Sequence, residues 1–361
     1  MAQASAVSSK LLQRYPWVSR PIVVSAPMRV LSGPALAVST SQAGGLGFIG
    51  PGAKTQDTIT DLEEASSLIQ QSRASAAFSR IPSTNSVLPV GVGFQLWKDE
   101  LDTAVTGIKK HKPCAVWLFA PHRVEEFASW SHRICEAYPS TQIWIQIGTL
   151  GEVKAILKGS EHPDVFVVQG AESGGHGRAK DGIGLISLLP EVVDAVASSS
   201  QIPIFGAGGI ADGRGAAAAL CLGASGVAMG TRFLAASEAR VSRGYQDEII
   251  RAADGAVSTT RTLLYNHLRG TYGWPKEYSP RTIINKSFTE HEAGKPFEEL
   301  QKFHDEAMRL GDGGWGPEGR LGTYAGASIG LVHDIKPAAD IVREVRQEVS
   351  QRVHLLQDIN A

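Results

Sequence analysis

The sequence predicts an α/β fold: a closed (β/α)8 barrel with a helical insertion after the eighth strand. Three observations support this prediction. Short apolar segments alternate with helix-like stretches through the first two thirds of the chain, as in βα units around a parallel sheet. Eight such segments occur, most of them apolar at nearly every position, as strands buried on both faces should be. The chain of 361 residues, 43% hydrophobic, can fill one large barrel.

Turn-forming residues separate the predicted strands from the helices. The strands span 21–27, 45–50, 88–94, 115–120, 143–148, 165–170, 202–208 and 226–230. Between them, helices are predicted over 34–42, 58–71, 99–110, 124–137, 184–197 and 213–222. An open doubly wound sheet is the alternative architecture, because the count of strands comes from a single sequence.

The barrel pattern ends after the eighth strand. We expect an N-terminal extension over 1–20, a barrel over 21–236 and 323–361, and a mostly helical insertion over 237–322 that covers the barrel mouth. Apolar positions at helical spacing over 337–352 predict a closing helix. The extension is interpreted as a frayed end, because Tyr15-Pro16-Trp17 interrupts any early amphipathic helix.

Composition excludes several classes of function. A net charge of -1 gives no basic face for nucleic acid. The sequence contains no run of about twenty apolar residues, so we expect no membrane span. The three cysteines lack the spacing of a disulfide framework or a zinc site. We therefore expect a cytoplasmic protein without metal; a mitochondrial location is a weaker alternative, because the first 56 residues lack Asp and Glu.

Four glycines surround one histidine after the sixth predicted strand, in the segment 170–178. Glycine permits positive φ and close approach of the backbone to a flat ligand, so His176 is the leading candidate for the chemistry. The alternative is a tight turn with an incidental histidine.

Glycines also follow the seventh and eighth strands, where barrels of this kind bind phosphate groups. Gly208, Gly209, Gly230 and the hydroxyl of Thr231 could converge on one anion. Alternatively, Asp212 and Thr231 cap helices and the glycines only form turns. Gln146 is a polar residue within an apolar strand, so it either faces the barrel mouth or is a satisfied core amide.

Five motifs at the ends of the predicted strands resemble those of the nitronate monooxygenase family. They are APM at 26–28, AGGLG at 43–47, ESGGH at 172–176, GAGGIADGR at 206–214 and MGTRF at 229–233. The resemblance spans 21–345 and implies a TIM barrel that binds FMN without a covalent link. It also implies oxidation of an alkyl nitronate or nitroalkane by O2 to a carbonyl compound and nitrite. The resemblance is compatible with a homodimer as well as with a monomer.

The resemblance assigns roles to eleven residues. The active-site histidine is His176, which in this family abstracts a proton or binds the anionic substrate; an ordinary imidazole pKa near 6.5 suits either role. The expected FMN contacts are Ala26, Pro27 and Met28 along the ring, Gln146 and Gly170 at its polar edge, Gly175 beside it, and Gly208, Gly209, Gly230 and Thr231 at the phosphate. Tyr324 and Trp315 are candidate lid aromatics.

Two residues depart from the family pattern. Gly93 stands near a position that is asparagine in many bacterial members, which removes a polar contact, and Ser173 replaces the usual alanine. The role of Glu172 is open between orienting the loop through backbone amides and simple exposure. Two other functions compete: an NAD(P)H-dependent flavin reductase acting on a quinone or an enoyl thioester, and a barrel that binds a phosphorylated ligand without catalysis.

Overall fold

The computed structural model describes residues 10–72, 78–81, 87–198, 200–316 and 318–358. Its centre is a closed parallel barrel in the order β1-β2-β3-β4-β5-β6-β8-β9. The barrel closes because Val24 of β1 pairs with Leu46 of β2 on one side and with Ala228 of β9 on the other. The predicted (β/α)8 TIM barrel is therefore confirmed, and the open sheet is wrong. Residues 1–9 of the predicted N-terminal extension lie outside the described residues.

Every predicted barrel strand is present, with bounds within two residues of the prediction. The strands are β1 (Ile22–Ser25), β2 (Leu46–Ile49), β3 (Leu88–Gln95), β4 (Pro113–Phe119), β5 (Gln142–Ile147), β6 (Val165–Gln169), β8 (Ile204–Ala207) and β9 (Gly226–Met229). Nearly all of their residues are buried, since the barrel interior covers one face and the helices cover the other.

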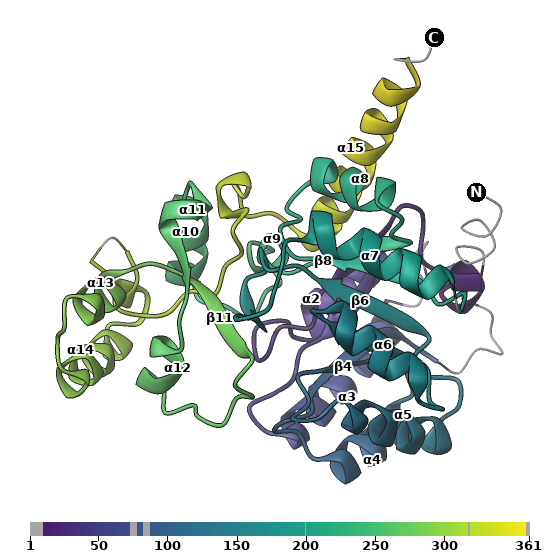
Figure 1. The fold of residues 1–361 in the computed structure, drawn as a ribbon, viewed down its shortest axis with the longest axis horizontal. Helices are drawn as coiled ribbons and strands as arrows, with labels where there is room; N and C mark the ends of the chain where they lie inside the picture. The colour runs from purple at the N-terminus through teal and green to yellow at the C-terminus, as the bar shows by residue number, and fades with distance from the viewer. Residues whose placement is uncertain (1–9, 73–77, 82–86, 199, 317, 359–361) are drawn as a thin grey trace.

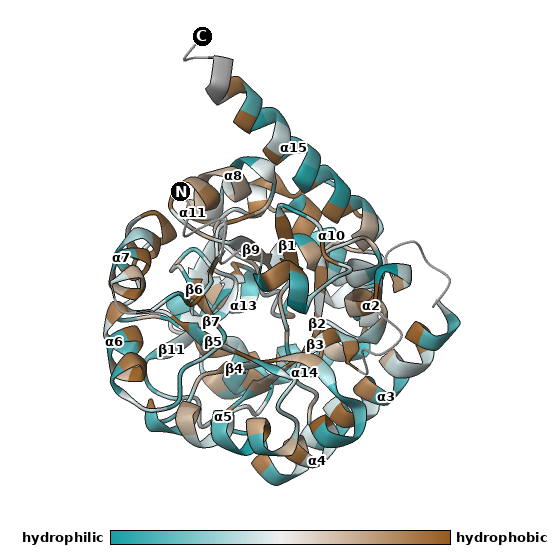
Figure 2. Cartoon of the chain, turned by 90° about the vertical axis from the view of Figure 1, so that its right-hand side faces the viewer, coloured by the Kyte–Doolittle hydropathy of each residue, from teal (hydrophilic) through white to brown (hydrophobic). Residues whose placement is uncertain are grey.

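Helices surround the strands, as the view along the barrel in Figure 2 shows. They are α2 (Pro34–Gln42), α3 (Thr55–Gln71), α4 (Leu101–His111), α5 (Glu125–Ala137), α6 (Leu150–Lys158), α7 (Leu185–Ala197), α8 (Gly213–Cys221) and α15 (Ala338–Asp358). We did not predict α6. Its signal was present, because Thr149 and Glu152 form a capping box at its start.

Aromatic side chains fill the barrel interior. The ring centroids of Phe48 and Trp144 lie 5.1 Å apart, and those of Trp144 and Phe205 lie 4.7 Å apart. Glycines on neighbouring strands make room for these rings: a Cβ on Gly91 would lie 2.3 Å from Cε1 of Phe48. The interior is thus a packed core, and a ligand can enter only at its end.

The N-terminal segment closes the other end of the barrel. Tyr15 and Trp17 are buried in the main core, and the hydroxyl of Tyr15 accepts a hydrogen bond of 2.9 Å from Nε1 of Trp144. The expectation of a frayed end is wrong for these residues. Burial of these two rings holds the segment against the barrel core on both sides of Pro16.

The segment between β9 and α15 lies to one side of the barrel in Figure 1. It contains α9 (Thr231–Leu234), α10 (Arg243–Arg251), α11 (Gly255–Ser258), β10 (Thr259–Arg261), α12 (Leu264–Leu268), β11 (Tyr278–Ile283), α13 (Lys286–Glu292) and α14 (Phe297–Arg309). A second sheet joins it to the barrel in the order β10-β11-β7, where β7 is Gly175–Arg178. The segment that we interpreted as a glycine loop therefore includes a strand.

Replacing Gly91 with alanine should destabilise the barrel, because the new methyl group overlaps the ring of Phe48. We expect the free energy of unfolding, measured with denaturant, to fall by about 1–3 kcal/mol. Adding Phe48→Leu should restore part of the loss. Gly151→Ala is the matched control, since the nearest atom to its Cβ is 3.7 Å away. Equal effects of the two alanine substitutions would contradict this account.

Candidate active site

A cavity of about 330 Å3 opens at the C-terminal ends of the barrel strands. Its walls combine the ends of β1, β3, β4, β5, β6, β8 and β9 with Tyr324 and with residues between α10 and α14. We call this stretch, from the start of α10 to the end of α14, the 243–309 segment. Enzymes with this barrel place their catalytic groups at the same end, and the volume is near the lower end of the range for small-molecule sites.

The structure gathers ten of the eleven predicted site residues around this cavity. They are Ala26, Pro27, Met28, Gln146, Gly175, His176, Gly208, Gly209, Gly230 and Thr231. Gly170 is not part of the wall. A Cβ on Gly170 would lie 2.3 Å from Oε2 of Glu172 and 2.7 Å from the backbone nitrogen of Leu185, so this glycine allows close packing of protein against protein.

The glycines of the wall allow sharp turns and leave open space. Gly208 and Gly209 have φ of +94° and +73°, which turns the chain sharply after β8. Gly175, with φ of +63°, and Gly230 border open space: a Cβ on Gly175 would meet no atom within 4 Å, and one on Gly230 would meet only Sδ of Met28, at 3.6 Å. A side chain at either position would occupy the cavity.

The neighbouring polar residues divide between capping and the cavity. Asp212 accepts hydrogen bonds from the backbone amides of Arg214 and Gly215, so it caps α8 as the alternative interpretation proposed. Thr231 does not cap a helix. Its Oγ1 accepts a hydrogen bond of 2.9 Å from the amide of Gly326, and its hydroxyl hydrogen, which has no acceptor among the described residues, can donate to a ligand.

His176 lies on β7 and pairs with Pro280 of β11, so a strand far along the chain fixes its backbone. Its ring stacks on Trp274, with centroids 3.5 Å apart and an angle of 5° between the planes. Its Nε2 lies 2.8 Å from Nδ2 of Asn266. Within the described part of the chain, Nδ1 has no hydrogen-bond partner and is the nitrogen left for a ligand.

Burial lowers the pKa of His176 well below its usual value, and the positive charges of Arg269, Arg261 and Arg29 lower this pKa further. The imidazole is therefore neutral at pH 7. Arg29 and Arg269 themselves line the cavity, and their guanidinium groups remain charged. No Asp or Glu of the described chain lines the cavity, so its field favours an anionic ligand.

Three glutamines at strand ends contribute amides to the wall: Gln95, Gln146 and Gln169. Oε1 of Gln146 accepts a 2.8 Å hydrogen bond from Nε1 of Trp117, which leaves its Nε2 available to donate. Oε1 of Gln95 is buried and has no partner in the described part of the chain. Nε2 of Gln146 can therefore donate a hydrogen bond to a polar ligand, and Oε1 of Gln95 can accept one.

The structure explains the two departures from the family pattern. A Cβ on Gly93 would lie 2.5 Å from Cβ of Pro27, so only glycine fits where β3 packs against the segment that follows β1. Gln95, two residues later on the same strand face, brings a carboxamide to the cavity instead. The hydroxyl of Ser173 accepts a 3.1 Å hydrogen bond from Arg261, a contact that alanine could not make.

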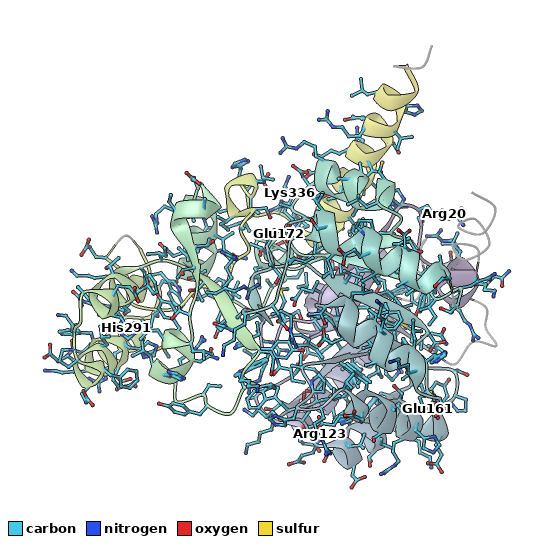
Figure 3. The ribbon with its side chains drawn as sticks, in the orientation of Figure 1. Arg20, Arg123, Glu161, Glu172, His291 and Lys336 are labelled. Carbon is cyan, nitrogen blue, oxygen red and sulfur yellow. The ribbon has the colours of Figure 1, made fainter. Side chains whose placement is uncertain are left out.

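Glu172 orients the loop. Its two carboxylate oxygens accept hydrogen bonds of 2.9 and 3.0 Å from the amide of Leu185, the first residue of α7. In Figure 3, Glu172 lies where the barrel meets the 243–309 segment, whereas His291 lies far out on that segment. A carboxylate at a helix N-terminus is electrostatically favourable. Of the two roles considered for Glu172, orienting the loop through backbone amides or simple exposure, these hydrogen bonds support the first.

Several wall residues were missed by sequence reasoning, chiefly Arg29, Gln169, Arg269 and Trp274. Gln169 ends an apolar strand and could have been found by the argument that we applied to Gln146. Arg269 and Trp274 carry no such signal, since only tertiary structure brings them to the barrel. Of the two candidate lid aromatics, Tyr324 lines the cavity. Trp315 does not; it packs against Tyr245 with ring centroids 6.1 Å apart.

The described part of the chain holds no cluster of three or more histidine, cysteine or acidic side chains arranged to bind a metal ion. None of its helices has the length and apolar character needed to cross a membrane. The polar side chains of the cavity wall are amides, hydroxyls, arginines and one histidine.

Comparison with known proteins gives a consistent result. The family model for nitronate monooxygenase matches residues 16–348. The chain is 56% identical over 339 residues to nitronate monooxygenase npaC of Metarhizium robertsii, which covers 94% of this chain and 93% of that relative. It is 34% identical over 372 residues to a nitronate monooxygenase of Neurospora crassa, covering 98% and 96%. Among solved structures, FabK from Thermotoga maritima matches with a TM-score of 0.71 and 26% identity, covering 97% and 98%.

The lowered pKa of His176 makes stability depend on pH. Unfolded histidine binds a proton near pH 6.5, whereas the folded ring does not, so stability falls as pH drops below 6.5. Between pH 7.5 and 5.5 the protein should lose about 1 kcal/mol more free energy of unfolding than the variant His176→Gln. Denaturant unfolding at several pH values measures this, and parallel curves for the two proteins would contradict the burial of a neutral ring.

Proposed function

Because the chain belongs to the nitronate monooxygenase family, we propose that it uses FMN and O2 to oxidise alkyl nitronates to carbonyl compounds and nitrite. Family membership makes the chain an oxidoreductase and implies a flavin cofactor. The observation that carries the proposal is the combination of a neutral histidine and two arginines in a cavity without carboxylates. Such a cavity suits a small organic anion, and a nitronate is one.

The wall fits FMN in two respects. Gly175 and Gly230 leave open space where side chains would stand, and Gly230 with Thr231 would hold the phosphate beside the turn at Gly208 and Gly209. Nε2 of Gln146 can donate, and the unpartnered Oε1 of Gln95 can accept, which matches the alternating acceptors and donor on the polar edge of a flavin. The chemistry that FMN supplies when bound is electron transfer from the nitronate to O2.

The residues of the chain hold and orient the substrate. Arg29 and Arg269 attract the negative charge of the nitronate, and Nδ1 of His176 is within the wall to meet a nitro oxygen. Trp274 covers one face of the imidazole and contacts Trp97, with ring centroids 4.8 Å apart. These rings exclude water around the polar groups and strengthen their electrostatic interactions.

Of the two other functions considered from the sequence, only the NAD(P)H-dependent reductase still competes with the proposed activity. A binding barrel without catalysis is not supported, because the chain belongs to a family of enzymes. A reductase that takes electrons from NAD(P)H uses the same barrel, so an experiment must separate it from the proposed activity.

The spectrum of the purified protein, or of protein supplied with FMN, should show the visible absorption bands of a bound flavin. Gly230→Val should weaken FMN binding by at least tenfold, because its side chain enters the proposed phosphate site. Titration of FMN monitored by fluorescence measures the change. Gly151→Ala, at an exposed position of α6 outside the cavity wall, should bind FMN like the parent protein. Equal affinity in the Gly230 variant would remove this loop from the FMN site.

Anaerobic mixing separates the two enzyme functions. An alkyl nitronate should bleach the flavin absorbance, and admission of O2 should restore it with release of nitrite. NADH and NADPH should leave the flavin oxidised, because the proposed reaction takes its electrons from the nitronate. Bleaching by NADPH without bleaching by nitronate would replace this proposal with the reductase function.

A further inference from the structure

A chain of hydrogen bonds leads from a guanidinium to the imidazole of His176. The Nη2 group of Arg269 contacts the hydroxyl of Tyr324, and this hydroxyl donates to Oδ1 of Asn266 at 2.9 Å. Nδ2 of Asn266 then lies 2.8 Å from Nε2 of His176. We call Arg269, Tyr324 and Asn266 the relay. Asn266 lies on α12, Arg269 directly follows it, and Tyr324 forms a bridge with Thr282 of β11.

Elementary hydrogen-bond chemistry sets the direction of the relay. A guanidinium can only donate, so the Tyr324 oxygen accepts from Arg269 and its own hydrogen goes to Oδ1 of Asn266. The amide is thereby oriented with its NH2 group toward His176. Because this group donates, Nε2 of His176 must be the nitrogen without a hydrogen. The neutral ring then carries its proton on Nδ1, the nitrogen without a protein partner.

The other groups around His176 do not oppose this state. The charged side chains that face it are Arg29 after β1, Arg261 on β10 and Arg269 after α12, all cationic. Trp274 offers the ring only a stacked face. No acidic side chain of the described cavity wall is available to hold a proton on Nε2.

We propose that the relay fixes His176 as a hydrogen-bond donor through Nδ1, so that the enzyme selects preformed nitronate anions over neutral nitroalkanes; this inference rests on the proposed function. Removal of the α-proton of a neutral nitroalkane would transfer that proton from carbon to Nδ1 and leave its electron pair in the nitronate. That transfer requires a lone pair on Nδ1, which the relay denies. A nitronate needs only the donor.

Two substitutions change the relay in defined ways. Asn266→Asp replaces the donor with a carboxylate, which would accept a hydrogen from Nε2 and leave a lone pair on Nδ1. Tyr324→Phe removes the hydroxyl that orients the amide, so that Asn266 can rotate. Tyr272→Phe is the matched control, because this exposed hydroxyl lies in the same segment and outside the cavity wall.

The first measurement is the state of the imidazole in the full-length protein, labelled with 15N in its histidine rings. The signals of His176, assigned by their loss in His176→Gln, should show a protonated Nδ1 and an unprotonated Nε2. In Asn266→Asp the two should exchange roles. A protonated Nε2 in the parent protein would overturn the inference, and this result does not depend on activity.

The second measurement compares kcat/KM for an alkyl nitronate and for its neutral nitroalkane. Their ratio should fall by roughly 10- to 100-fold in Asn266→Asp, because a hydrogen bond to the anion is lost and a base is gained. It should fall about fivefold in Tyr324→Phe and stay constant in Tyr272→Phe. An unchanged ratio in both relay variants would overturn the role of the relay. A parent protein that oxidises neither substrate would instead overturn the proposed function.

Discussion

The guanidinium of Arg261 holds the segment on which the site depends. It donates to the backbone carbonyls of Ala171, Ser173 and Gly175 and, across the second sheet, to that of Ser279 at 2.5 Å. Burial lowers the pKa of Arg261 to about 10, helped by the charge of Arg281, so the group stays charged at pH 7. A buried cation is costly unless hydrogen bonds satisfy it, and here the carbonyls satisfy both Nη groups, while Nε has no partner in the described part of the chain. The segment around His176 is therefore fixed by interactions with its backbone, which tolerate its glycines.

Sequence reasoning recovered the barrel because each strand is a local signal. Buried parallel strands are apolar throughout, and the glycines after β8 and β9 mark turns that local sequence specifies. Gln146 was recognised for the same reason, as a polar residue in an apolar strand. The capping box of α6 was equally local and was overlooked.

The remaining features depend on distant pairing. His176 was assigned to a loop because glycines disfavour strands, yet β7 forms since β11 supplies its backbone partners. Asn266 and Tyr324 reach the histidine from segments with no periodic signal. Gly170 illustrates a different point: its missing side chain was attributed to a cofactor, and the structure shows that a side chain there would overlap Glu172 and the start of α7. A glycine in the sequence indicates that a side chain would not fit at that position, but it does not indicate whether a ligand or another part of the protein occupies the space.

The second sheet also determines when the site can exist. All eight barrel strands lie before residue 230, whereas the partners of His176 come from residues 259–283 and 324. A ribosome releases the chain from its N-terminus, so the eight strands emerge before β11 and the relay, whereas α15, whose Ile341 and Val342 lie in the barrel core, emerges last. The surroundings of His176 can therefore be completed only near the end of synthesis.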